Sequence, residues 1–134
     1  IHLALSRFLF SFHQVFTGTL SIVQMDSNIP TEFSISQNYP NPFNPVTSIA
    51  FNVIEMNKIS LIVYDLSGKE IITLVSGTYM PGSYRVNWDA VNNIGESIAS
   101  GMYVYRYISG DKAISRKMLY LKNSKRKYLE NNTI

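Results

Sequence analysis

Residues 58–69 read KISLIVYDLSGK, and this stretch decides the fold class. Ile59, Leu61 and Val63 recur at every second position, which places three apolar side chains on one face of a β-strand. The turn sequence Asp65–Gly68 follows, with Asp at its first position and a Gly that can adopt positive φ. The stretch therefore predicts a β-hairpin with one buried face.

Other short runs with period-two alternation recur along the chain, separated by turn residues, and none shows helical periodicity. They cover residues 47–54, 69–76, 84–88, 103–107 and 113–122. The pattern predicts an all-β protein, a seven-stranded antiparallel immunoglobulin-like sandwich. The side chains predicted to form its core are Phe51, Leu61, Val63, Val86, Trp88, Tyr103 and Tyr105.

The chain divides into four predicted segments. Residues 33–122 form the sandwich, and residues 26–32, DSNIPTE, form a polar linker before it. Residues 1–25 are interpreted as the remnant of an upstream domain or as an unstructured stretch, with a signal peptide around Arg7 as an open alternative. Polar residues interrupt this stretch too often for a transmembrane helix. Residues 123–134 are predicted to be a flexible basic tail.

Charge is concentrated near the carboxyl end, because seven of the twelve Lys and Arg residues follow Gly110. Such a tail suits an anionic surface, or it is a solvated end that keeps the protein soluble. The tail lacks the alternation of basic and aromatic residues that is typical of proteins that bind single-stranded nucleic acid, so nucleic acid is not a predicted partner. The chain has no cysteine, which excludes disulfides and thiol chemistry.

Candidate catalytic residues are scarce. His2 and His13 are the only histidines, and both precede the predicted sandwich, which excludes a His-based relay or metal site inside it. The seven glycines stand singly, so no phosphate-binding loop is formed. The sequence therefore predicts a module that is not an enzyme and has no cofactor and no metal. The loop Asp89–Glu96 leaves two alternatives open, a calcium site or a plain Asx-turn.

Tyr103, Tyr105 and Tyr107 alternate along one predicted strand. Exposed, such a row would be a platform on which sugars stack. Buried, the rings would fill the core while the hydroxyls reach its rim, and the polar Arg106 between them favours this second interpretation.

Residues 38–45, NYPNPFNP, form a predicted rigid arm. The three prolines hold φ near one value, bias each preceding residue toward extended conformations and remove backbone donors. An arm of this kind beside the last strand could present an edge that a receptor completes by strand addition. The prolines could equally protect that edge from aggregation.

The chain resembles the C-terminal sorting domains of type IX secretion substrates over residues 33–122. The resemblance rests on QNYPNPFNP (37–45), VYDLSGKE (63–70) and ASGMYVY (99–105), together with Gly82, Trp88-Asp89 and Arg116-Lys117-Met118. At two places the sequence departs from the family pattern. Twelve residues follow Lys122, and Ala90-Val91 replaces the usual Gly-rich start of the loop after Trp-Asp.

The resemblance implies a non-catalytic module that directs an attached N-terminal cargo protein across a bacterial outer membrane to the surface or the medium. The implied partners are an outer-membrane secretion translocon and a sortase-like surface peptidase. The implied recognition residues are Tyr39, Pro40, Asn41, Pro42, Phe43, Asn44, Pro45, Lys117, Met118 and Leu119. The immunoglobulin-like domain of flagellar hook-capping proteins is similar in architecture, so a structural or carbohydrate-binding module is the alternative.

Overall fold

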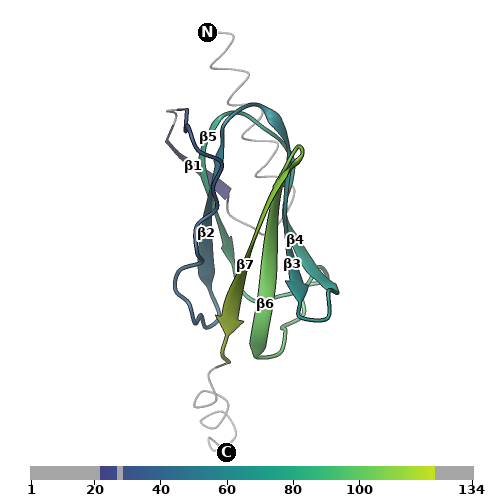
Figure 1. The fold of residues 1–134 in the computed structure, drawn as a ribbon. Helices are drawn as coiled ribbons and strands as arrows, with labels where there is room; N and C mark the ends of the chain where they lie inside the picture. The colour runs from purple at the N-terminus through teal and green to yellow at the C-terminus, as the bar shows by residue number, and fades with distance from the viewer. Residues whose placement is uncertain (1–21, 27–28, 123–134) are drawn as a thin grey trace, which may run out of the picture.

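Two antiparallel sheets pack face to face in the computed structural model, which describes residues 22–26 and 29–122 (Figure 1). The smaller sheet has the order β1-β5-β2, and the larger has the order β4-β3-β6-β7. The strands are β1 (Ile22–Asp26), β2 (Thr47–Val53), β3 (Asn57–Asp65), β4 (Glu70–Tyr79), β5 (Gly82–Trp88), β6 (Gly101–Ser109) and β7 (Lys112–Tyr120). The prediction of a seven-stranded antiparallel sandwich is confirmed.

The hairpin that joins β3 and β4 forms at the predicted turn. The amide of Gly68 donates to the carbonyl oxygen of Asp65 at 3.0 Å, and Gly68 has a φ of 89°, which favours glycine. Asp65 Oδ1 accepts three further hydrogen bonds, from the amide and hydroxyl of Ser67 and from the amide of Lys69. These bonds, the Ser67 hydroxyl first, lower the pKa of the Asp65 carboxyl group.

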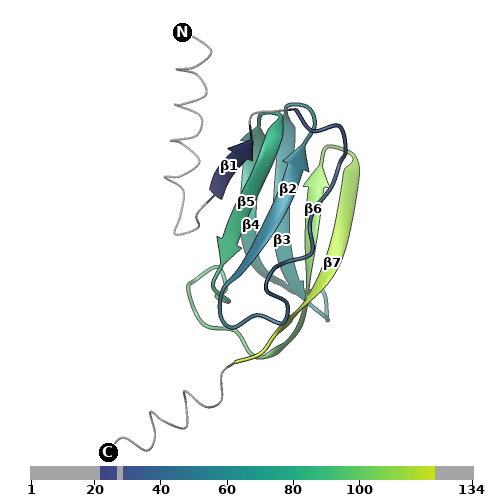
Figure 2. The ribbon, with the colours of Figure 1, turned by 90° about the vertical axis from the view of Figure 1, so that its left-hand side faces the viewer.

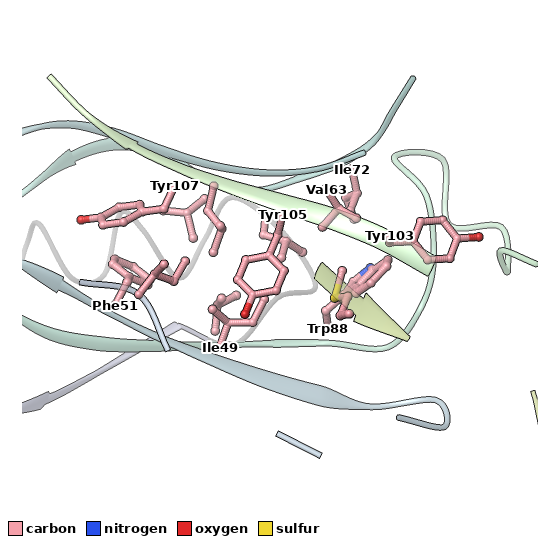
Figure 3. Close-up of a cluster of buried hydrophobic side chains, with 14 of the residues drawn as sticks. Ile49, Phe51, Val63, Ile72, Trp88, Tyr103, Tyr105 and Tyr107 are labelled. Carbon is pink, nitrogen blue, oxygen red and sulfur yellow. The ribbon is translucent and has the colours of Figure 1, made fainter. Parts of the chain in front are cut away.

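The core lies between the two sheets and is rich in aromatic rings (Figure 3). All seven side chains that the alternation assigned to it are buried, with exposures between 0% and 7%. Phe51 is near the centre of an aromatic cluster, with its ring centroid 5.5 Å from that of Tyr84 and 5.2 Å from that of Tyr107. Nine of the 22 buried hydrophobic residues that the structure describes are aromatic, and each large ring buries more apolar area than an aliphatic side chain does.

Strand β1 lies outside the domain that the sequence predicted. Ile22–Asp26 was expected to belong partly to an upstream segment and partly to a linker, with the sandwich starting at residue 33. Instead β1 pairs antiparallel with β5, where Ile22 lies opposite Val86 and packs against the core. A five-residue edge strand with exposed Val23 and Met25 has too short a pattern to be recognised from its sequence. Its pairing with β5 supplies the seventh strand.

The remaining predictions for the chain ends, at residues 1–21 and 123–134, lie outside the described residues. Every regular element in the described part of the chain is a strand, and no helix there is long and apolar enough to cross a membrane.

Trp88→Ala should destabilise the domain by about 3–5 kcal/mol, because the ring is 1% exposed and its removal leaves a large cavity in the core. Urea unfolding followed by circular dichroism measures this loss. Ile94→Ala is the control, since Ile94 is 77% exposed and its truncation should change the free energy of unfolding by less than about 0.5 kcal/mol. A loss below about 1 kcal/mol for Trp88→Ala would contradict its place in the core.

Candidate recognition arm and terminal strand

The proline arm, Asn38–Pro45, and the residues leading into it run along one side of the sandwich between β2 and β7 (Figure 2). β2 is the edge strand of the smaller sheet, and β7 is the edge strand of the larger one. The arm therefore lies where the two sheets open toward solvent, and it contacts both.

The residues that lead into the arm, and Tyr39 within it, pair with β2. Ser36 donates its amide to the carbonyl oxygen of Ala50 at 2.7 Å, and Asn52 donates its amide to the carbonyl oxygen of Ser34 at 3.0 Å. Tyr39 and Ser48 exchange two backbone hydrogen bonds of 2.9 and 2.8 Å. Tyr39 can donate because its own nitrogen carries a hydrogen, unlike the nitrogen of Pro40 that follows.

The second half pairs with β7. Leu119 donates its amide to Asn41 Oδ1 at 3.0 Å and accepts the amide of Phe43 at 3.0 Å. Leu121 then donates its amide to the carbonyl oxygen of Phe43 at 3.1 Å. The edge of β7 is therefore already paired at residues 119 and 121. An incoming strand could pair there only after the arm left, so this geometry favours edge protection over strand addition.

Phe43 is the side chain that fixes the arm to the core. It is 1% exposed, and its ring centroid lies 5.6 Å from that of Trp88 and 5.1 Å from that of Tyr120. Phe43 and Met118 were both expected among the recognition residues, but Met118 is also fully buried, at 0% exposure. Their side chains therefore stabilise the domain and do not face a receptor.

Buried polar groups hold the arm as well, and the sequence analysis did not identify them. Tyr105 Oη accepts the amide of Asn38 at 2.9 Å and donates to the carbonyl oxygen of Ser36 at 2.7 Å. The side chain of Asn38, 2% exposed, donates to Thr47 Oγ1 at 3.0 Å and to the carbonyl oxygen of Pro40 at 3.1 Å. A hydropathy pattern does not reveal such residues, because buried amides and hydroxyls look like surface residues until their partners are known.

The rest of the predicted set is exposed. Tyr39 is 81% exposed even though its backbone is held against β2. The other exposed members are Pro40, Asn41, Pro42, Asn44, Pro45 and Lys117, while Leu119 is half-buried. The structure thus brings the arm and β7 together. Phe43 and Met118 form a buried layer that anchors the arm to the core, and the exposed residues form an exposed layer that is free to make contacts.

The tyrosine row is buried, so it offers no platform for sugars. Tyr103, Tyr105 and Tyr107 are between 0% and 7% exposed. Their hydroxyls donate to the carbonyl oxygens of Ala99, Ser36 and Asn52, at 2.6, 2.7 and 2.8 Å. The rings fill the core and the hydroxyls reach its rim, as the second interpretation expected.

The loop Asp89–Glu96 uses its amide side chains to order its own backbone. Asn92 Oδ1 accepts the amides of Ile94 and Glu96, and Asn93 Oδ1 accepts the amide of Thr73. This arrangement is the Asx-turn alternative. Within residues 22–26 and 29–122 there is no group of three or more His, Cys, Asp or Glu that could hold a metal ion.

A family model described as the secretion system C-terminal sorting domain matches residues 37–121, more than half of the chain. This chain belongs to that family. The match begins at Gln37, directly before the arm, and ends at Leu121, whose amide binds the carbonyl oxygen of Phe43. It therefore spans the arm and strands β2 to β7 but not β1. Sorting domains of this family mark proteins that the type IX secretion system brings to the cell surface or releases.

Two solved structures from Porphyromonas gingivalis are similar to this sorting domain. Dimeric latent PorU has a TM-score of 0.58 and 17% sequence identity, with 74% of this chain and 10% of the PorU chain covered. PorZ, described as an essential surface component of the type IX secretion system, has a TM-score of 0.44 and 20% identity, covering 63% of this chain and 11% of that chain. The likeness to PorU shows the fold. No curated protein sequence matches the chain.

Tyr105→Phe should destabilise the sorting domain by about 1–3 kcal/mol, because it leaves the buried amide of Asn38 without its acceptor. Urea unfolding gives the loss, and hydrogen exchange should show faster exchange at the Asn38 amide. Tyr64→Phe is the matched control, since Tyr64 is half-buried on the outer face of β3 and should cost less than about 0.5 kcal/mol. Equal losses for the two variants would contradict the anchoring role of Tyr105.

Stability should also fall at high pH. Burial raises the pKa of Tyr79 and of Tyr105 to about 12 each, and it raises the pKa of Tyr107 further. In the unfolded chain a tyrosine loses its proton near pH 10. Above that pH these three tyrosines ionise in the unfolded chain but stay protonated in the folded domain. Their contribution to the free energy of unfolding is therefore fully present below pH 10 and is lost as pH rises toward 12. Absorbance at 295 nm together with urea unfolding tests this; full tyrosine ionisation near pH 10 in a folded domain would contradict it.

Proposed function

We propose that this sorting domain is a non-catalytic export signal that carries an attached N-terminal cargo protein across the bacterial outer membrane. The translocon reads the exposed layer of the proline arm, with Tyr39 at its centre. The observation that carries this proposal is the 81% exposure of Tyr39 on a backbone that is held by hydrogen bonds to β2. An exposed aromatic ring on an ordered segment binds a partner at low entropic cost.

The absence of catalysis in this proposal is supported by how the polar groups are used. Asp65 orders a hairpin, and Asn92 and Asn93 order a loop. The two histidines of the chain lie outside the described residues. These three polar side chains therefore serve the fold, as suits a signal that acts by being recognised.

A sortase-like surface peptidase is the second proposed partner, one that removes the domain after export. Residues 29–32 precede the arm, and Ile29, Thr31 and Glu32 are exposed in the structure. A protease needs an accessible segment, and the exposed side chains of this stretch before the arm meet that requirement.

A reporter fusion tests the export role. Residues 22–122, placed behind a fluorescent protein exported to the periplasm, should bring the reporter to the surface or the medium of a host with the type IX apparatus. Deletion of residues 113–122 removes most of β7 and should abolish export. A folded fusion that stays in the periplasm, while the same cells export a control substrate, would refute the sorting role.

Tyr39→Ala separates recognition from folding. Its thermal midpoint should equal that of the wild type, because the ring is exposed, while export should fall by about 10-fold or more if the ring is a central contact. Phe43→Ala should lower both the melting temperature and export, because the loss of this buried ring leaves a cavity in the core. Met56→Ala, at a 66% exposed residue away from the arm, should change neither. Undiminished export of Tyr39→Ala would remove Tyr39 from the recognition surface.

A further inference from the structure

The outer face of the larger sheet carries a hollow that no residue of the arm lines. It has a volume of about 440 Å³ and lies beside the β3–β4 hairpin. Half-buried Tyr64 and Val104, direct cross-strand neighbours on β3 and β6, lie at its base. Leu66 of the hairpin, 66% exposed, lines it as well, together with Arg106 and Ser115. A hollow of this size with an apolar base and a few polar groups is a usual binding surface.

The hollow lies on a cationic part of the molecule. On β6 and β7 this face carries two charged side chains, Arg106 and Lys117, and both are cations. Lys112 and Arg116 point away from it, toward Phe33 and the carbonyl oxygen of Ile35. Arg106 is exposed, and its direct cross-strand neighbours are the uncharged Ile62 and Ser115. Lys117 lies directly opposite Val104, so its side chain shares the face of the hollow.

Asp65 is the acid that lines the hollow, and its carboxylate is turned toward the hairpin. Oδ1 accepts the amide of Ser67 at 2.9 Å, the hydroxyl of Ser67 at 2.6 Å and the amide of Lys69 at 3.0 Å. Asp65 is thus engaged by its own turn, while the guanidinium group of Arg106 is exposed at the hollow. Glu70 lies directly across from Tyr64 on the β4 side, so a ligand carboxylate would bind on the opposite side of the hollow, where Arg106 has uncharged cross-strand neighbours and Lys117 is close by.

The hollow is continuous with the arm through Lys117. The carbonyl oxygen of Lys117 accepts a hydrogen bond from Gln37 Nε2 at 2.7 Å, while its side chain lies on the face of the hollow. A partner that contacts Tyr39 and the prolines could therefore extend across β7 to Arg106 without leaving the surface. This continuity points to the export receptor, and not to an unrelated ligand, as the occupant.

We infer that the hollow binds an acidic peptide segment of the export receptor, with an apolar side chain on Tyr64 and Val104 and a carboxylate on Arg106 and Lys117. The inference rests on the proposed export function and adds a second contact surface to it. The guanidinium group would bind the carboxylate in two parallel hydrogen bonds, which gives orientation as well as attraction.

Two variants test the hollow in the reporter fusion. Arg106→Glu/Lys117→Glu reverses its charge and should reduce export at least 10-fold. Ser115→Glu places a carboxylate directly across from Arg106, where it occupies the guanidinium group from within the chain, and it should reduce export to a similar extent. Both variants change exposed residues only, so their melting temperatures should stay within a few degrees of the wild type.

Matched controls carry the same changes elsewhere. Lys58→Glu/Arg85→Glu has the same net charge as the first variant, and Ser76→Glu repeats the second on β4; all three residues are exposed and lie outside the hollow. Both controls should be exported like the wild type. Flotation of the purified domain with vesicles containing phosphatidylglycerol distinguishes a lipid ligand from a peptide.

The outcomes separate this inference from the proposed function. Failure of the wild-type fusion to leave the periplasm refutes the sorting role itself. If Arg106→Glu/Lys117→Glu and Ser115→Glu are both exported like the wild type, the binding role of the hollow is refuted and the sorting role is not. Vesicle binding by the wild type that these variants lose also overturns the inference, because the face would then bind anionic lipid. Loss of export in both variants, with no vesicle binding and with normal controls, supports it.

Discussion

The contact of the Phe43 ring with Trp88 and Tyr120 is the interaction on which the rest of the structure depends. Trp88 ends β5 in one sheet and Tyr120 ends β7 in the other, so a single ring from the arm joins both layers at one end of the sandwich. The backbone of Phe43 meanwhile forms one hydrogen bond with Leu119 of β7 and one with Leu121 just after the strand. Packing and hydrogen bonding act at the same residue, which fixes the arm in register with the terminal strand.

Because the arm is fixed there, it covers the neighbouring edges of both sheets. β2 pairs with residues 34–39, and β7 pairs with residues 41 and 43. An exposed strand edge invites pairing with other chains, which is a hazard for a module that has to remain separate during transport. On this side of the sandwich the remaining surface consists of side chains, namely the exposed residues of the arm and the outer face of β6 and β7.

Strand β6 shows how one stretch of sequence serves both the core and the surface. Tyr103, Tyr105 and Tyr107 face inward and place their hydroxyls on backbone carbonyl oxygens at the rim of the core. Val104 and Arg106, between them, face outward and line the hollow. The two-residue period of a strand forces this division, so the core and the outer surface are set by alternate residues.

The sequence by itself determined the fold class, the hairpin at Asp65–Gly68 and the core side chains, because each depends on a local pattern of period two or on turn chemistry. It also predicted that the arm and β7 matter together, through the family motifs that both contain. It did not predict that Phe43 and Met118 turn inward. Phe43 stands in a proline-rich stretch without a period, and Met118 begins four consecutive apolar residues, 118–121, which give no alternation. The roles of Asn38, the Tyr105 hydroxyl, strand β1 and the hollow beside Arg106 were decided only by tertiary structure. Each depends on a partner at least nine residues away along the chain, and the position of that partner exists only once the two sheets have packed.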